Sequence, residues 1–158
     1  GYAIKLLAHA QRVGEETFTV FVSPQLVKKE SLLGNVSGVM NAVVVKGNAV
    51  GECLFYGAGA GRMPTASAMV ADMIDVFRRA GSRKFIDWAP ERPELLVDPD
   101  TVPSRWYVRY TGGCANAKTE CCVSENGFCA AITPAMSKKE LETAFDGIEV
   151  LSAFRVLD

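Results

Sequence analysis

The chain has 158 residues, of which 49% are hydrophobic and 22% are charged, and its formal net charge at pH 7 is -1. This composition is typical of a globular protein with one medium domain or two small ones. A charge so close to zero gives no long-range field that would recruit nucleic acid or an anionic membrane. No apolar run approaches the ~20 residues that span a bilayer, and no signal-peptide pattern opens the chain, so we expect a cytoplasmic protein.

The first segments of the chain are β-prone. Residues 3–9 are mostly apolar, which suits a strand or the end of a helix. Residues 17–22 alternate apolar and β-branched positions, which predicts a strand that ends at Pro24. The sequence starts with Gly1 inside an apolar stretch, so we expect it to begin in the middle of a longer protein.

A hairpin is predicted next. Two β-prone runs, residues 39–45 and 49–56, flank a turn that contains Gly47 and Asn48. A Gly-Asn pair between such runs is a hairpin signal. The second arm of this hairpin leads directly into the most distinctive stretch of the chain.

That stretch is a loop with glycine at every second position, Gly57, Gly59 and Gly61, followed by a helix. Pro64 suits the first helical position and Gly81 the residue past the end. Apolar residues recur between them at helical spacing: Ala66, Met69, Val70, Met73, Val76 and Phe77. A strand, a glycine loop and a helix start bring backbone amides close to a ligand.

The glycine loop allows two interpretations. It resembles a dinucleotide fingerprint, but the third glycine comes too early and the acids downstream still lie in a helix, which argues against a self-contained Rossmann domain. The loop either contacts a cofactor or substrate held mostly by another domain, with the Thr65 hydroxyl adding a donor, or it is a tight turn without a ligand.

The rest of the chain reads as a linker and a second small unit. Residues 82–104 contain four prolines, which favours a linker or a meandering arm and places a domain boundary here. Residues 105–110 predict a strand, and Asn126-Gly127 predicts the turn of a hairpin between two further strands. Ser137 and Glu140 form a capping-box pattern for a helix, which a final strand follows at residues 148–157.

Metal or thiol chemistry has little support in the sequence. Four of the five cysteines are spaced Cys114-x6-Cys121-Cys122-x6-Cys129, without a C-x-x-C pair, so reduced thiols are expected and a thiol site at Cys121-Cys122 is the alternative. His9 lies in an apolar run, which favours a hydrogen-bonded core histidine over a catalytic base.

Four blocks of the sequence stand out together: Gly-Tyr-Ala-Ile-Lys-Leu-Leu-Ala at residues 1–8, Gly-Val-Met-Asn-Ala-Val at 38–43, Gly-Glu at 51–52, and Phe-Tyr-Gly-Ala-Gly-Ala-Gly-Arg-Met-Pro-Thr-Ala-Ser-Ala at 55–68. In this order they resemble the later half of the catalytic domain of homoserine dehydrogenase. The resemblance covers about residues 1–80.

The resemblance implies an oxidoreductase that uses NADP or NAD and interconverts L-homoserine and L-aspartate 4-semialdehyde in threonine, methionine and isoleucine biosynthesis. The cofactor would be bound mainly by an N-terminal Rossmann domain that precedes these residues. The family's catalytic lysine and acidic residues would also lie upstream of residues 1–8 and so be missing here. Gly57, Gly59, Gly61 and Thr65 would lie near the nicotinamide, and the enzyme would be a homodimer. We expect no catalytic residue, no metal site and no activity in this portion alone.

The second unit resembles an ACT domain, a βαββαβ module that senses an amino acid. Residues 112–118 stand where the first helix would be, so we expect a degenerate, ferredoxin-like unit without that helix. The predicted fold is α+β: a partial mixed-sheet substrate and dimerisation domain at residues 1–81, a linker at 82–104 and the ACT-like unit at 105–158. The alternative is a freestanding ACT-like module for amino-acid sensing or oligomerisation.

Overall fold

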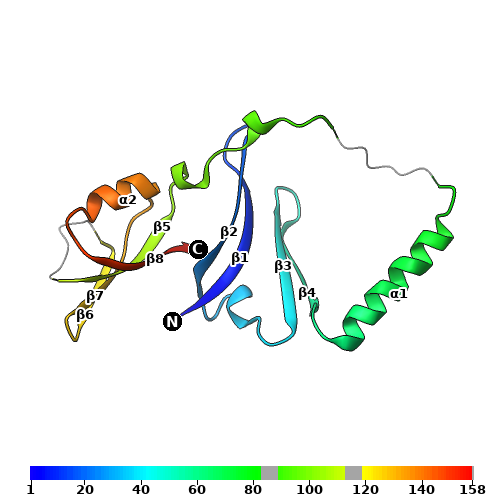
Figure 1. The fold of residues 1–158 in the computed structure, drawn as a ribbon, viewed down its shortest axis with the longest axis horizontal. Helices are drawn as coiled ribbons and strands as arrows, with labels where there is room; N and C mark the ends of the chain where they lie inside the picture. Colours follow the sequence, from blue (N-terminus) through cyan, green and yellow to red (C-terminus); the bar gives the residue numbers. More distant parts are fainter. Residues whose placement is uncertain (83–88, 113–118, 158) are drawn as a thin grey trace. The chain divides into compact units, whose positions relative to one another are not determined.

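The computed structural model describes residues 1–82, 89–112 and 119–157 (Figure 1). Contacts along the backbone divide the chain into two compact units, residues 1–29 with 91–158 and residues 30–90. The fold is α+β, with a mixed six-stranded sheet in the first unit and a two-stranded hairpin in the second. Among the described residues, no helix is long and apolar enough to cross a membrane.

The six-stranded sheet has the order β1-β2-β8-β5-β7-β6. Its strands are β1 (Tyr2–Arg12), β2 (Phe18–Lys28), β5 (Arg105–Thr111), β6 (Cys121–Glu125), β7 (Phe128–Ile132) and β8 (Val150–Leu157). Among these strands β2 and β8 pair in parallel, through residues 25–27 and 155–157, and the other neighbours pair antiparallel. The last strand in the chain therefore lies in the middle of the sheet.

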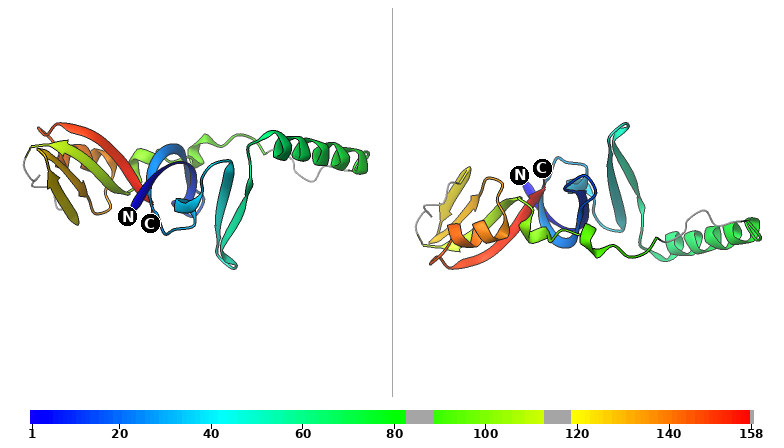
Figure 2. Two further views of the ribbon diagram at one scale, coloured as in Figure 1. Left: turned by 90° about the horizontal axis from the view of Figure 1, so that it is seen from below. Right: turned by 90° about the horizontal axis from the view of Figure 1, so that it is seen from above.

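The strands β1 and β2 form a long curved ribbon (Figure 2). The prediction that the second strand ends at Pro24 was wrong, because β2 continues to Lys28 with Pro24 opposite Leu6 of β1. On its other side β2 meets β8 only from Gln25 onward, so Pro24 lies where no neighbouring strand needs its missing N–H. Proline is tolerated in a strand at such an edge position.

The core of the first unit lies between the sheet and helix α2 (Lys138–Ala144). The predicted capping box is present: Ser137 Oγ accepts from the Glu140 amide, and the Glu140 carboxylate accepts from the Ser137 amide at 2.7 Å. Leu141 and Phe145 pack on alternate residues of β5 and β7, namely Trp106, Val108, Tyr110, Cys129 and Ala131. Apolar residues four positions apart on the helix thus pack against apolar residues two positions apart on the strands, on one face of the sheet.

The predicted turn between β6 and β7 is confirmed. Asn126 and Gly127 both have positive φ, 52° and 77°, which is the conformation that a two-residue type I′ turn requires. The residues that stand in place of a first ACT helix, 113–118, lie outside the described residues.

The proline-rich stretch contains two short 3-10 turns, η2 (Pro93–Leu95) and η3 (Pro99–Thr101). Between them the amide of Val97 donates to the carbonyl of Phe18 at 2.8 Å. Residues 91–104 are therefore held against β2 within the first unit.

The second unit contains η1 (Leu33–Asn35), the hairpin β3 (Met40–Gly47) and β4 (Gly51–Ala58), and helix α1 (Arg62–Arg78). The predicted hairpin is confirmed, with its turn moved to residues 48–50. Among the described residues, none covers the predicted apolar stripe of the helix: α1 has no buried residue, and Phe77 is 77% exposed. A stripe of this kind ordinarily packs against another element.

Candidate functional site

The glycine loop connects β4 to α1 and is held by backbone contacts. The amides of Gly59 and Ala60 both donate to the carbonyl of Val39, at 3.1 and 3.3 Å. A Cβ on Gly59 would lie 1.5 Å from Nδ2 of Asn41, so a larger side chain there would displace Asn41. This close approach explains the glycine at position 59.

Gly61 is the N-cap of α1, with φ 112° and ψ 151°. This region of backbone space is essentially restricted to glycine. No side chain caps the helix, and the Thr65 amide donates to the Gly61 carbonyl at 3.1 Å. The amides of Arg62 and Met63 lie in the first turn, where no helical carbonyl stands four residues earlier to accept from them. They therefore face outward from the helix start.

The four predicted site residues therefore lie along one strand-to-helix corner. Gly57 is in β4 opposite Asn41, Gly59 is in the loop, Gly61 caps the helix and Thr65 is in its first turn. The helix begins at Arg62, two residues before the start that Pro64 suggested. Loop and helix start are exposed, and the amides could bind an anionic or carbonyl oxygen at this corner.

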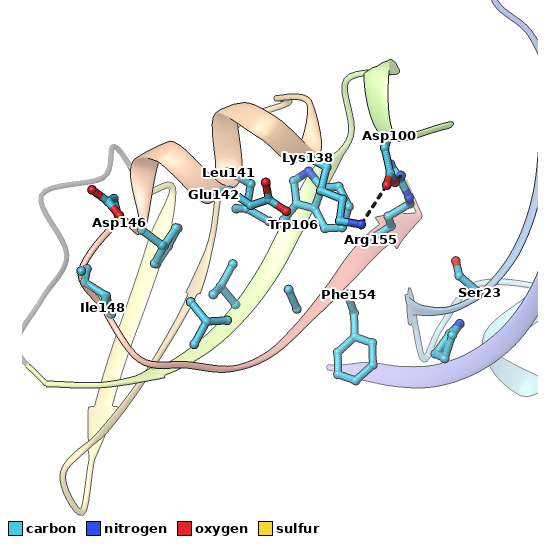
Figure 3. A pocket seen from close by; sticks show the side chains of 16 residues that line it. Ser23, Asp100, Trp106, Lys138, Leu141, Glu142, Asp146, Ile148, Phe154 and Arg155 are labelled. Atoms are coloured by element: carbon cyan, nitrogen blue, oxygen red, sulfur yellow. Dashed lines mark hydrogen bonds and ion pairs between the residues drawn. The ribbon is translucent and has the colours of Figure 1, made fainter. Parts of the chain in front are cut away.

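Sequence reasoning missed a second candidate, a groove in the first unit between α2 and β8 (Figure 3). Its volume is about 630 Å³. It exists because α2 packs over β5 and leaves the adjacent strand β8 uncovered on the same face. The capping box predicted the helix, but no motif marks the groove, because its residues come from distant parts of the chain.

One end of the groove is closed by Arg155, whose side chain is 8% exposed. Its Nη1 donates to Ser104 Oγ at 2.8 Å, and its Nη2 donates to the Pro99 carbonyl at 3.0 Å and to Asp100 Oδ1 at 2.9 Å. These contacts tie the proline-rich arm to the central strand of the sheet.

Arg155 is also stacked between two aromatic rings. Its guanidinium carbon lies 4.4 Å from the Trp106 ring centroid and 4.9 Å from that of Phe21. Burial lowers the pKa of Arg155, and the neighbouring Asp100 carboxylate acts in the opposite direction. Because Arg begins from so high a pKa, it stays protonated at neutral pH.

At the same end, Lys138 Nζ donates to Asp100 Oδ2 at 2.8 Å (Figure 3). This hydrogen bond lowers the pKa of Asp100 and raises the pKa of Lys138. Glu142 lies one turn further along α2 on the groove side. The groove therefore has several charged side chains at one end, and toward the other end Asp146 lies beside the apolar Ile148.

His9 lies in β1, where its ring stacks on Phe21 with 5.2 Å between centroids. Burial, and secondarily the charge of Arg155, lower the pKa of His9. Within the described part of the chain, no group of three or more His, Cys, Asp or Glu side chains could hold a metal ion.

Comparison with protein families gives a match to homoserine dehydrogenase over residues 1–74. The homoserine dehydrogenase of Pseudomonas aeruginosa is 48% identical over 102 residues, which cover 65% of this chain and 22% of the relative. That of Neisseria gonorrhoeae is 42% identical over 120 residues, covering 69% and 26%. The aligned parts thus span about a quarter of these relatives.

Comparison with solved structures extends the similarity to the whole chain. A homoserine dehydrogenase from Thiobacillus denitrificans superposes with a TM-score of 0.80 at 30% identity, over 100% of this chain and 43% of that one. The enzyme of S. aureus gives 0.66 at 25% identity, over 100% and 42%. The chain spans less than half of the solved proteins that it matches.

Proposed function

We propose that this chain, which corresponds to the C-terminal portion of a homoserine dehydrogenase, is part of an NAD(P)-dependent enzyme that interconverts L-homoserine and L-aspartate 4-semialdehyde. The observation that carries the proposal is the sequence match over residues 1–74, which contains the whole glycine loop. Under this proposal NADP or NAD is bound mainly by an N-terminal domain outside this portion, and the catalytic lysine and acid also lie upstream of residue 1.

The glycine loop would complete the nicotinamide site. Gly59 and Gly61 let the backbone approach a ligand without a side chain in the way, and the outward amides of Arg62 and Met63 could favour an amide or carbonyl oxygen of the cofactor. Gly57 and Thr65 flank this corner on the strand and helix sides. The chemistry of hydride transfer belongs to the cofactor, while these residues would position it.

The bare apolar faces of the chain support a larger assembly. Ile4, Leu6, Val20 and Val22 line one face of the β1–β2 ribbon and are all more than half exposed. Contiguous apolar surface of this kind usually marks an interface. We propose that the remainder of the enzyme and a second subunit of a homodimer cover this face and helix α1.

The proposed domains are residues 1–81 for the substrate and dimerisation domain, 82–104 for the linker and 105–158 for an ACT-like unit. In the last, β5, β6, β7, α2 and β8 follow one another, with β5 inserted between β7 and β8 as in a split βαβ arrangement. These boundaries differ from the two compact units because β2 pairs with β8 in one sheet.

The test joins this chain to the N-terminal part of the Pseudomonas aeruginosa relative and follows formation of reduced cofactor from L-homoserine. We expect activity from the joined protein and none from the chain alone. Activity of the isolated 158-residue chain would contradict the proposal.

Gly61→Ala and Gly51→Ala form a matched pair for the cofactor contact. Both glycines have positive φ, 112° and 75°, but Gly51 lies at the far end of β4. We expect only Gly61→Ala to raise the KM for the cofactor in the joined enzyme. Equal effects of the two variants would contradict a role for the loop in cofactor binding.

A further inference from the structure

We propose that the groove between α2 and β8 binds a small molecule with a carboxylate head group and an apolar body of about four to six carbon atoms. The inference is independent of the proposed dehydrogenase function, because all groove residues lie in the first compact unit and none belongs to the glycine loop.

The size and origin of the groove suit such a ligand. Its volume of about 630 Å³ lies within the range of roughly 300–1,000 Å³ that is usual for small-molecule sites. Ala153 lies opposite Val108 in the pairing of β8 with β5, so a small side chain forms the floor beside the helix. A larger residue at Ala153 would fill the groove.

The apolar part of the lining can hold the body of the ligand. Its accessible residues are Ile148, Val150 and Ala153, whereas Val108, Leu141 and Phe145 line it but are almost fully buried. Leu141 and Phe145 also belong to the core, which fixes their positions. Transfer of an aliphatic body from water onto such a surface is favourable in proportion to the apolar area that it buries.

The charged end can hold the head group. Lys138 and Arg155 bring two positive charges there, beside the carboxylates of Asp100 and Glu142, and Lys138 is the more exposed of the two cations. The Lys138 side chain is 47% exposed, and its ammonium has three donors, of which Asp100 accepts one. A ligand carboxylate can therefore bind Lys138 without displacing Asp100.

Glu142 decides between two sources of this carboxylate chemistry. It lies four residues after Lys138, and side chains at this spacing on a helix have Cβ atoms about 5–6 Å apart. A free carboxylic acid would use Lys138 alone, whereas an amino acid would also place its ammonium against Glu142. Leucine and 4-methylpentanoate share the same apolar body and differ in this ammonium.

Trp106 supplies the signal for the experiment, because it lines the groove and the chain has two tryptophans. In a Trp88→Phe background, the whole chain is titrated with 4-methylpentanoate and with leucine while Trp106 fluorescence is followed, and calorimetry repeats the titration. We expect saturable binding of at least one ligand. Binding of 4-methylpentanoate identifies a carboxylic-acid site, whereas binding of leucine alone identifies an amino-acid site.

Lys138→Met and Lys139→Met form the matched pair of variants. Lys139 is the exposed neighbour that does not line the groove. We expect Lys138→Met to weaken binding about tenfold or more, as for loss of a charged hydrogen bond, and Lys139→Met to leave it unchanged. Ala153→Phe is the second variant, and it should abolish binding while far-UV circular dichroism confirms the fold.

Two results would overturn the proposal. One is the lack of saturable binding of either ligand by fluorescence and by calorimetry. The other is equal affinity in Lys138→Met and Lys139→Met together with undiminished binding in folded Ala153→Phe. Glu142→Gln then tests the leucine arm: weaker leucine binding supports ammonium recognition, and unchanged leucine binding overturns it.

Discussion

Replacement of Arg155 by methionine should destabilise the first unit by about 2–3 kcal/mol. The change removes three hydrogen bonds from a guanidinium whose side chain is 8% exposed, and it removes a cation stacked between two rings. Hydrogen bonds to a charged group contribute about 1.5–3 kcal/mol each, and each ring contact roughly 0.5–2 kcal/mol. The gross sum is reduced because methionine avoids the desolvation of a buried charge and still packs between the rings.

The loss of stability stays at about 2–3 kcal/mol because Asp100 is not left unpaired when Arg155 is replaced. Its side chain is 44% exposed and keeps its ion pair with Lys138, so water and Lys138 compensate for the lost guanidinium. A deeply buried partner left alone would cost about 3–5 kcal/mol instead. The Pro99 carbonyl likewise keeps the hydrogen bond from the Val102 amide at 3.2 Å, so it is not left without a donor.

Urea unfolding followed by Trp106 fluorescence in the Trp88→Phe background measures the free energy of unfolding of the first unit. Arg109→Met is the control, because Arg109 also lies over a ring, 4.8 Å from Phe128, but is exposed. It should cost less than about 1 kcal/mol. If Arg155→Met lost no more stability than Arg109→Met, the buried contacts of Arg155 would not stabilise the first unit as expected.

Three further changes test the same unit. Ser137→Ala should cost about 1 kcal/mol in urea unfolding, because it removes the capping box of α2; an unchanged midpoint would contradict the cap's role. Leu141→Ala should cost about 2–4 kcal/mol, since Leu141 is 6% exposed in the core, whereas Glu142→Ala on the same helix should cost little. The pKa of His9 is lowered in the folded protein, so as the pH falls the unfolded chain binds a proton at His9 first. The free energy of unfolding should therefore decrease below pH ~6.5. His9→Phe should remove that part of the pH dependence in unfolding curves measured between neutral and mildly acidic pH.

The sequence predicted the elements whose signals are local. The capping box at Ser137, the Asn126-Gly127 turn and the apolar spacing of α1 each depend on residues a few positions apart. Each of these elements forms, although α1 begins two residues before Pro64. Pro24 was misread because its effect depends on whether a second strand lies beside it, which only the sheet topology decides.

Long-range packing created what the sequence did not reveal. The groove combines residues from the proline-rich arm, α2 and β8, and Arg155 joins them across 55 positions to Asp100. Within the final strand prediction nothing distinguished Arg155 from a solvent-facing residue. The glycine loop, in contrast, was visible in the sequence, because a position where the backbone approaches its neighbours closely requires glycine.

The central place of β8 constrains how the first unit can form. Residues 150–157 leave the ribosome after all other strands, yet they join β2 to β5. Until then the β1–β2 hairpin and the β5–β7–β6 strands are separate, with unpaired edges and with long loops still to close. Folding of the first unit during synthesis should therefore be completed late. Until β8 is available, the β1–β2 hairpin exposes an apolar face and an unpaired strand edge, which makes it a segment that chaperones would have to protect.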